Sequence, residues 1–299
     1  MTSLRSFARN VYSQYGEDGI LAELFNQLSV SLGYFVEFGA WDGIHLSNCH
    51  ALLEQGWEGC YIEGDAERYR QLCQNISQSS VHKIQRFVAI AGPNSLDEIL
   101  KQISAPNDFD LLSIDIDGDD LAMWRSLTHY RPKCIVIEYN PTIPFDSLFE
   151  NIPGETWGNS ALSIDSFGRS TGYSLMATTE TNLIYLDDKY SESVPLDTLT
   201  LADVAPGLRY FWGYDGTLLK GSISPSTETA DIAPEFFRVP WAGSIAVQPI
   251  PRFLRLYKDE PSILNHSRRI LAATIAIALR PASSLQRFKA KLVRRFPGR

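Results

Sequence analysis

Five short apolar segments, each followed by a segment with helical periodicity, constrain the fold of this chain more than any other feature. The apolar segments cover residues 34–38, 59–63, 84–91, 109–115 and 133–138. The intervening segments repeat their apolar residues every three or four positions, which is the period of an amphipathic helix. Strands that alternate with helices build a parallel sheet whose two faces are both covered. The sequence therefore predicts an α/β domain.

The predicted helices cover residues 12–28, 47–55, 66–76, 95–103 and 119–127, and a sixth runs from about Asn159 to Gly172. Two of them have recognisable first residues. Ser47 is predicted to cap its helix, and Ser95 with Glu98 has the spacing of a capping box.

Two further strands are predicted at residues 173–178 and 183–187. The link between them is too short for a parallel crossover, so they must form an antiparallel hairpin. Five parallel strands followed by such a hairpin predict a mostly parallel, seven-stranded sheet. This is the Rossmann-like arrangement of class I methyltransferases.

Composition divides the chain into three predicted parts. Residues 1–189 hold the strand and helix pattern. Residues 190–265 are rich in Pro, Gly, Ser, Thr and aromatic residues, with strand-like pieces at 244–247 and 253–257, and are predicted to be a cap that binds the acceptor. Residues 266–299 read as an alanine-rich apolar stretch followed by a basic amphipathic helix, and form a predicted helical tail.

The charge of the chain is unevenly distributed. Residues 266–299 hold nine of the 27 basic residues and none of the 35 acidic ones, so the remainder carries a net charge of −17. An acidic body argues against nucleic acid as a partner of the main domain. The basic tail is expected to touch something anionic, either a membrane surface or a protein surface, including the acidic body itself. Liposome co-sedimentation of a chain truncated at residue 265, at two salt concentrations, separates these alternatives.

The N-terminal residues contain no apolar core of a secretory signal, and the longest apolar run, residues 270–279, is too short to span a bilayer. The four scattered cysteines favour buried, reduced thiols. We expect a cytoplasmic protein that associates peripherally with the inner face of the cell membrane.

A glycine-containing loop follows the first predicted strand and carries acids beside its glycines. Its pattern is Glu37-x-Gly39-x-x-Asp42-Gly43, which differs from the Gly-x-Gly-x-x-Gly of pyrophosphate-binding loops. S-adenosylmethionine bears a sulfonium and an ammonium group instead of phosphates, which accounts for acids at this position. Glu63 ends the second strand, where a carboxylate can accept both ribose hydroxyls. The alternative is an ordinary glycine-rich turn with acids present by chance.

A second group of polar residues follows the fourth and fifth strands, where ligands of open α/β sheets bind. Asp115 and Asp117 end one strand, and Glu138 and Asn140 end the other. This arrangement resembles the Mg²⁺ site of catechol-type O-methyltransferases, because such oxygen ligands suit Mg²⁺ or another divalent cation. A metal there would activate a hydroxyl. Without a metal, Asp117 or its neighbour Asp115 is the candidate general base, and His45 is a rival.

Several motifs together resemble the FkbM-type methyltransferase family. They are Tyr12-Ser-Gln-Tyr-Gly-Glu-Asp18, Phe35-Val-Glu-Phe-Gly-Ala-Trp-Asp-Gly43, Ser47-Asn48, Gly56-Trp-Glu-Gly59 and Ile62-Glu63. The resemblance covers about residues 12–187 and implies methyl transfer to a hydroxyl of a sugar or natural product. It also implies cofactor contacts from Glu37, Gly39 and Glu63. The family pattern Asp-x-Glu-Gly has Asp117 in place of its glutamate here, which leaves the metal open.

These observations predict an S-adenosylmethionine-dependent O-methyltransferase that acts on a glycan or lipid-linked glycan acceptor. Two alternatives remain from the residues alone: a metal-dependent hydrolase or phosphotransferase that uses Asp115 and Asp117, and a non-catalytic assembly module. The expected cofactor contacts are Glu37, Gly39, Ala40, Asp42, Gly43, Ser47, Asn48, Glu63 and Asp115.

Overall fold

The computed structural model describes residues 3–191 apart from 142, 144 and 146, the short stretches 194–195, 197–201, 208–212, 218–222 and 230–231, and residues 261–279. The chain divides into two units, residues 1–207 and 208–299. The candidate site lies in the first unit.

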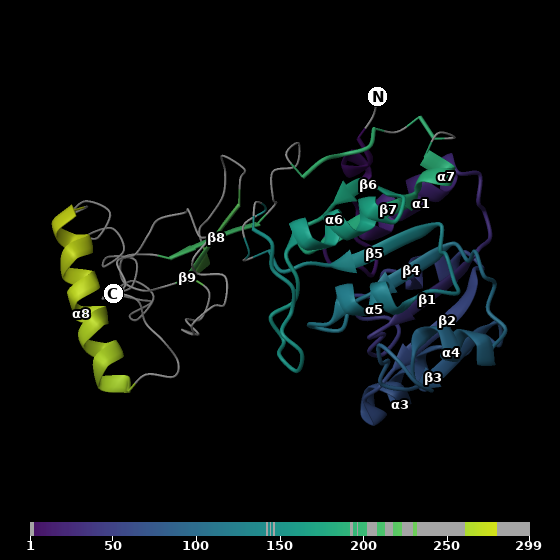
Figure 1. Ribbon diagram of the computed structural model, residues 1–299, viewed down its shortest axis with the longest axis horizontal. Helices are drawn as coiled ribbons and strands as arrows, with labels where there is room; N and C mark the ends of the chain where they lie inside the picture. The colour runs from purple at the N-terminus through teal and green to yellow at the C-terminus, as the bar shows by residue number, and fades with distance from the viewer. Residues whose placement is uncertain are drawn as a thin grey trace, which may run out of the picture. The chain divides into compact units, whose positions relative to one another are not determined.

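The first unit contains one seven-stranded sheet with the strand order β3-β2-β1-β4-β5-β7-β6 (Figure 1). Strands β1 to β5 are parallel, whereas β7 runs antiparallel to both β5 and β6. This order and the terminal hairpin define the class I methyltransferase fold, so the predicted fold class is confirmed. The strands are β1 (Tyr34–Phe38), β2 (Glu58–Glu63), β3 (Val81–Gln85), β4 (Leu111–Ile114), β5 (Cys134–Glu138), β6 (Tyr173–Thr178) and β7 (Asn182–Asp187).

Helices cover both faces of this sheet, which is why its central strands are mostly apolar. Successive residues of β1 illustrate the division: Phe35 packs with α1, α2 and α3, whereas Val36 and Phe38 pack with α4, α5 and α6. The helical elements are η1 (Leu4–Phe7), α1 (Glu17–Gln27), α2 (His50–Glu54), α3 (Ala66–Asn75), α4 (Leu96–Gln102), α5 (Asp120–Ser126), α6 (Ala161–Ser170) and α7 (Asp188–Ser191).

The third strand was predicted at residues 84–91, and this placement is wrong. β3 covers Val81–Gln85, and beyond it only Ala89 makes a bridge, to Ser95. β3 lies at the edge of the sheet, where only β2 pairs with it. It is less covered than the central strands, and its residues are mostly polar. The apolar residues that follow leave the sheet, and Phe87 is 73% exposed.

The helices predicted at 12–28 and 47–55 begin later than expected. α1 begins at Glu17, because the residues before it form a turn around the Asp18 carboxylate, which accepts hydrogen bonds from the amides of Val11, Tyr12 and Ser13. α2 begins at His50, with Cys49 at the N-cap position. Ser47 still caps this segment, because its hydroxyl accepts from the amides of Cys49 and His50. The Ser95 cap is confirmed, since its hydroxyl accepts from the Glu98 amide.

The second unit contains a three-stranded antiparallel sheet of β8 (Leu208–Trp212), β9 (Leu218–Ser222) and β10 (Ala230–Asp231), and the helix α8 (Ser262–Leu279). Among the described residues, no helix is both long and apolar enough to cross a membrane. The strand-like pieces predicted at 244–247 and 253–257 and the basic segment 280–299 lie outside the described residues. The three-part division, the acceptor-binding cap and the anionic partner of the tail therefore stay predictions.

The buried Glu17 side chain joins the start of α1 to the distant β6–β7 turn. Its carboxylate accepts hydrogen bonds from the Tyr15 amide, the Thr179 hydroxyl and the Asn182 side-chain amide. Glu17 is fully buried, and the two hairpin residues are nearly so. A charge can be held in such a place only because every partner donates to it.

We predict that Glu17→Ala lowers the free energy of unfolding by about 2–4 kcal/mol, because it leaves two buried donors and the part-buried Tyr15 amide without an acceptor. Urea denaturation of both proteins measures the difference. Glu67→Ala is the matched control, since Glu67 makes an exposed pair with Arg70 and its loss should cost under about 1 kcal/mol. Equal losses in the two variants would contradict this role for Glu17.

Candidate active site

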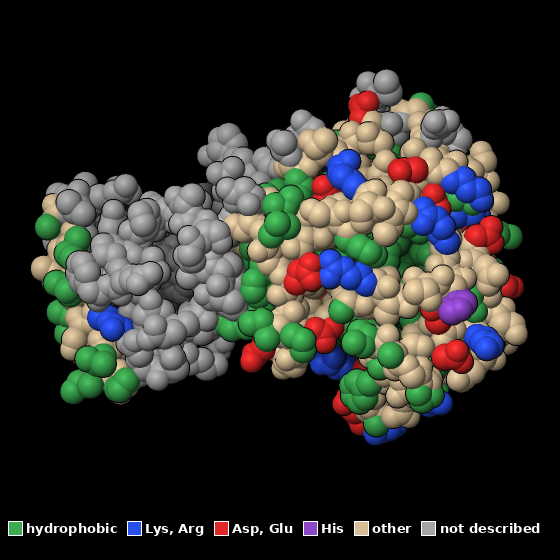
Figure 2. Space-filling view, viewed as in Figure 1, with side chains coloured by type: hydrophobic (Ala, Val, Ile, Leu, Met, Phe, Trp, Pro, Cys, Tyr) green, Lys and Arg blue, Asp and Glu red, His purple; other side chains and the backbone are tan. Residues whose placement is uncertain are grey.

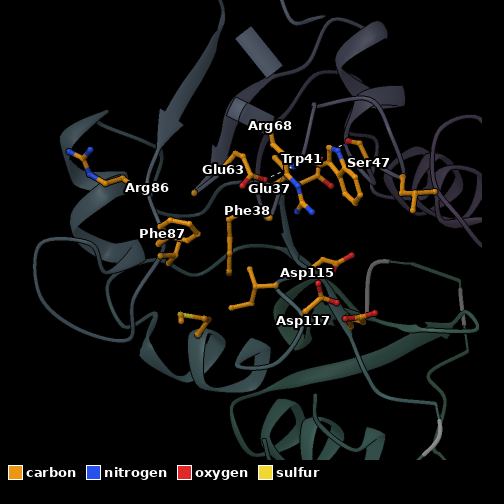
Figure 3. Close-up of a pocket in the computed structure, with 18 of the residues that line it drawn as sticks. Glu37, Phe38, Trp41, Ser47, Glu63, Arg68, Arg86, Phe87, Asp115 and Asp117 are labelled. Atoms are coloured by element: carbon orange, nitrogen blue, oxygen red, sulfur yellow. Dashed lines mark hydrogen bonds between the residues drawn. The ribbon is translucent and has the colours of Figure 1, made fainter. Parts of the chain in front are cut away.

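A pocket of about 460 Å³ opens at the carboxyl ends of the parallel strands (Figure 3). Its walls come from the ends of β1, β2 and β4, the loops that follow β1 and β3, and Glu138 at the end of β5. Ligands of open α/β sheets bind at this edge, where the strand order reverses on either side of β1 and β4. The pocket therefore lies where the sequence predicted a ligand.

The loop after β1 passes very close to the end of β4. Gly39 has a φ of +75°, and a Cβ atom at this position would lie 1.7 Å from the Asp115 carbonyl oxygen. Only glycine fits this approach. The Ala40 amide donates to the carbonyl of Ile62, so the loop is also fixed to β2. Both Gly39 and Ala40 line the pocket, as predicted.

Glu37 is buried at the end of β1 and organises this loop. Its carboxylate accepts a hydrogen bond from the Ser47 hydroxyl (Figure 3) and another from the Asn48 amide. The Asn48 side chain in turn donates to the Ser113 hydroxyl on β4. Burial raises the pKa of Glu37 to about 6, although these hydrogen bonds oppose the shift. Glu37 and Ser47 line the pocket, whereas Asn48 supports it from behind.

Asp42 and Gly43 were predicted as cofactor contacts, but neither lines the pocket. The Asp42 carboxylate accepts from the amides of Ile44 and His45 and so shapes the turn. Gly43 packs against α3, where a Cβ atom would lie 2.5 Å from a methyl group of Leu72. These residues build the loop and do not face its cavity.

Glu63 ends β2 and faces the pocket (Figure 3). One carboxylate oxygen accepts from the Trp41 amide at 2.8 Å, and the other accepts from the Asp65 amide at 2.7 Å. Each carboxylate oxygen has a second lone pair. Glu63 is therefore held in place by the backbone and can still accept two hydroxyl groups of a ligand.

Several lining residues were missed by sequence reasoning. Phe87 and Val88 follow β3, Gln14 comes from the turn before α1, and Met123 lies on α5. Arg68 lies over the Trp41 ring, with 4.0 Å between its guanidinium carbon and the ring centre. The misplaced third strand concealed Phe87 and Val88. A predicted strand that ended at Gln85 would have placed both residues just after a strand end, where ligands of such sheets bind.

Three carboxyl groups converge at the ends of β4 and β5. One oxygen from each of Asp115, Asp117 and Glu138 lies within 4.8 Å of the others. Asp115 and Asp117 are exposed at the pocket, and Glu138 is half-buried. Desolvation by the surrounding protein and repulsion from the neighbouring carboxylates raise the pKa of Asp115 to about 7 and that of Glu138 to about 9. Crowded acids of this kind favour a bound proton, or a cation in its place.

The turn after β4 aims Asp117 at the pocket. Asp117 has a left-handed backbone with a φ of +56°, which is unfavourable for a residue other than glycine. The buried Asp120 carboxylate stabilises the turn by accepting from the amides of Ile116 and Gly118. Burial raises the pKa of Asp120 to about 6. Asp120 therefore shapes the site and does not open to the cofactor pocket.

Of the remaining predicted site residues, Asn140 lies beside this carboxyl cluster, since it lines a smaller cavity together with Asp117 and Glu138, whereas His45 lies on another wall. Asn140 does not line the cofactor pocket, and its side-chain amide donates to the carbonyl of Trp157 at 2.6 Å. His45 lines the pocket on the glycine-loop side, where its ring packs edge-on against Trp41. The structure therefore brings together Asp115, Asp117 and Glu138.

On the face of the first unit drawn in Figure 2, basic side chains are interspersed with acidic ones and form no continuous patch among the described residues. The pocket also contains side chains of both charges, since Arg68 and Arg86 line it together with a larger number of acidic residues.

The sequence matches no protein-family model and no curated protein. Among solved structures, it is similar to the CurJ carbon methyltransferase, at 10% identity over 59% of this chain and 56% of that chain, with a TM-score of 0.40. A Staphylococcus aureus structure named as a candidate caffeoyl-CoA O-methyltransferase matches at 10% identity. The match covers 62% of this chain and 93% of that chain, with a TM-score of 0.42. An S-adenosylmethionine-dependent methyltransferase from Aquifex aeolicus matches at 10% identity over 55% and 87%, with a TM-score of 0.35. The chain spans little more than half of the CurJ structure. The fold assignment rests on the strand order, because these scores are too low to carry an argument.

We predict that Asp115→Asn raises the melting temperature more at pH 8 than at pH 5. The folded-state pKa of Asp115 lies above its ordinary value of 3.8. Its contribution to stability is therefore fully present below pH 3.8 and is lost as the pH rises through about 7. Asparagine has no charge to accommodate at either pH.

Melting curves in buffers that contain EDTA measure this difference without interference from metal ions. Asp108→Asn is the control, since Asp108 is exposed and precedes β4 at the opposite end of the strand. Its effect should be the same at the two pH values. A pH-independent effect of Asp115→Asn would contradict the proposed crowding.

Proposed function

We propose that this protein is an S-adenosylmethionine-dependent methyltransferase that transfers a methyl group to a hydroxyl of a glycan or lipid-linked glycan. The observation that carries the proposal is the acid-lined pocket at the carboxyl ends of β1, β2 and β4, in a domain with the class I methyltransferase strand order. The FkbM-type resemblance of the motifs supports the O-methyl and glycan parts.

The residues of the pocket fit S-adenosylmethionine. A volume of about 460 Å³ lies within the range of about 300–1,000 Å³ for small-molecule pockets. Glu63 retains lone pairs for two ribose hydroxyls. Phe87 and Val88 offer apolar contacts for the adenine ring, and Asp115 offers a carboxyl group to the positively charged part of the cofactor.

S-adenosylmethionine, when bound, supplies an activated methyl group for direct transfer to an oxygen atom. The protein must hold the acceptor hydroxyl in line and remove its proton. We assign the base role to Asp117, because the turn after β4 directs its carboxyl group into the pocket. Asp115 is the alternative base, since a pKa of about 7 suits a general base. His45 is the less favoured base, because its ring packs against Trp41 on the glycine-loop side of the pocket and is not part of the carboxyl cluster.

The three converging carboxyl groups also fit a divalent cation. Asp115, Asp117 and Glu138 offer hard oxygen ligands of the type that Mg²⁺ prefers. Such an ion would relieve the repulsion among them and activate a hydroxyl as a Lewis acid. We keep the Asn140 side-chain oxygen as a further candidate ligand, because the bond to the Trp157 carbonyl uses the amide nitrogen.

Isothermal titration calorimetry tests the cofactor. We expect the wild type to bind S-adenosylhomocysteine, and Glu63→Gln to weaken the affinity by about 10- to 100-fold through loss of charged hydrogen-bond acceptors. Glu67→Gln, on the exposed side of α3, should bind as the wild type does. Absence of heat with both S-adenosylmethionine and S-adenosylhomocysteine in the wild type would refute the proposed function.

Methyl transfer is tested with radiolabelled S-adenosylmethionine and a glycan fraction from the source cells. We expect label that survives acid hydrolysis in a mono-O-methyl sugar. Asp117→Asn should lower the rate by about 10²- to 10⁴-fold, as for loss of a general base, without loss of S-adenosylhomocysteine binding. Asp108→Asn is the control that should retain the rate.

The same assay with EDTA, and then with added Mg²⁺, decides between a metal and a free base. Label in nucleic acid, in protein or in base-labile methyl esters would contradict an O-methyltransferase of glycans. Hydrolysis of a phosphate ester that depends on Asp117, without methyl transfer, would favour the hydrolase alternative.

A further inference from the structure

A second, smaller cavity of about 190 Å³ adjoins the cofactor pocket. The two cavities share only Asp117 and Glu138 as lining residues. The remaining walls of the second cavity come from both ends of the long connection between β5 and α6, namely residues 139–141 and 156–158, and from Asp120. A group bound in this cavity would therefore lie beside the carboxyl groups to which we assign hydroxyl activation.

Hydrogen bonds from asparagine side chains hold the walls of this cavity in place. Asn140 donates to the Trp157 carbonyl, which joins the two ends of the connection. Asn151 accepts from the Trp157 amide at 3.0 Å and donates to the Asp119 carboxylate at 2.7 Å. Asn159 donates to the Gly118 carbonyl at 2.8 Å. The connection is thus tied to the turn that carries Asp117, and the cavity is formed before any ligand binds.

The lining has the chemistry of a site for a polyhydroxylated ring. It offers the half-buried Trp157 ring together with the carboxyl groups of Asp117 and Glu138, and the buried Tyr139 and Asp120 form its inner wall. Among the described residues, no Lys, Arg or His lines this cavity. Carboxyl groups accept hydrogen bonds from hydroxyls, and an aromatic face packs against the C–H groups of a sugar ring. A phosphate or carboxylate would be repelled.

The size of the cavity limits its occupant. A volume of about 190 Å³ is below the range of about 300–1,000 Å³ for pockets that enclose drug-sized ligands. It suits one monosaccharide unit and excludes a longer oligosaccharide.

We propose that this second cavity binds one neutral pyranose unit of the acceptor and presents one of its hydroxyls to Asp117. This inference rests on the proposed function and adds to it the place and the size of the acceptor subsite. It makes Trp157 and Thr156, which the sequence did not single out, determinants of acceptor binding.

Saturation-transfer NMR tests the proposal on the full chain. The probes are the methyl glycosides of glucose, galactose, mannose and rhamnose, with tetramethylammonium as a cationic probe and catechol as an aromatic one. We expect at least one glycoside to receive saturation, and Trp157→Ala to weaken its binding by about tenfold through loss of one aromatic contact. Trp157→Phe should restore most of the binding.

Two further variants keep the test decisive if Trp157→Ala does not fold. Thr156→Trp fills the cavity from an exposed position and should abolish glycoside binding. Trp41→Phe alters an indole of the cofactor pocket and should leave glycoside binding unchanged.

The proposal is overturned if no glycoside receives saturation, if only tetramethylammonium or catechol binds, or if Thr156→Trp binds glycosides as the wild type does. S-adenosylhomocysteine binding is measured on the same samples. Its failure in the wild type refutes the methyltransferase function, whereas glycoside binding decides the acceptor subsite separately. Glu63→Gln distinguishes the two sites, since it should weaken cofactor binding and leave glycoside binding unchanged.

Discussion

The buried Glu37 carboxylate accepts hydrogen bonds from the Ser47 hydroxyl and the Asn48 amide, and the shape of the cofactor pocket depends on these bonds. They draw the loop after β1 back onto the strand that precedes it. Asn48 then reaches Ser113 on β4, so one acid couples the two central strands through the loop. The contact between Gly39 and the Asp115 carbonyl sets the other end of the loop. Glu17 has a corresponding role at the β6–β7 turn.

The acids of this domain divide into those that shape the backbone and those that face a ligand. Asp18, Asp42 and Asp120 each accept at least two backbone amides and fix a turn. Asp115, Asp117 and Glu138 instead converge on one another, and the pKa values of Asp115 and Glu138 are raised as a result. Such crowding is unfavourable for the isolated protein at neutral pH. A proton, a divalent cation or a cationic cofactor would each relieve it, so the electrostatics of the site favour positively charged ligands.

Sequence patterns located most of the fold correctly, and several of the predicted site residues line the pocket. The strands β1, β2, β4 and β5 and the β6–β7 hairpin lie where apolar runs predicted them, because both faces of a parallel sheet must be covered. β3 was misplaced because it is an edge strand with a polar pattern. The sequence could indicate pocket residues because the ends of strands are visible in the apolar pattern, and ligands bind there. Four such residues line the pocket, namely Gly39, Glu63, Asp115 and Asp117. Asp42 and Gly43 occupy the same motif yet face elsewhere, and only the path of the loop reveals this.

The sequence by itself determined the α/β class, the order of the strands along the chain and the acids that end β1, β2, β4 and β5. These features follow from local periodicity and from the rule that parallel strands end at one edge. Only the tertiary structure decided which acids converge, how Arg68 comes to lie over Trp41, and that a second cavity opens between the two ends of the β5–α6 connection. Those contacts join residues far apart in the chain. They depend on the register between strands and on loop paths, which a pattern of residue types does not specify.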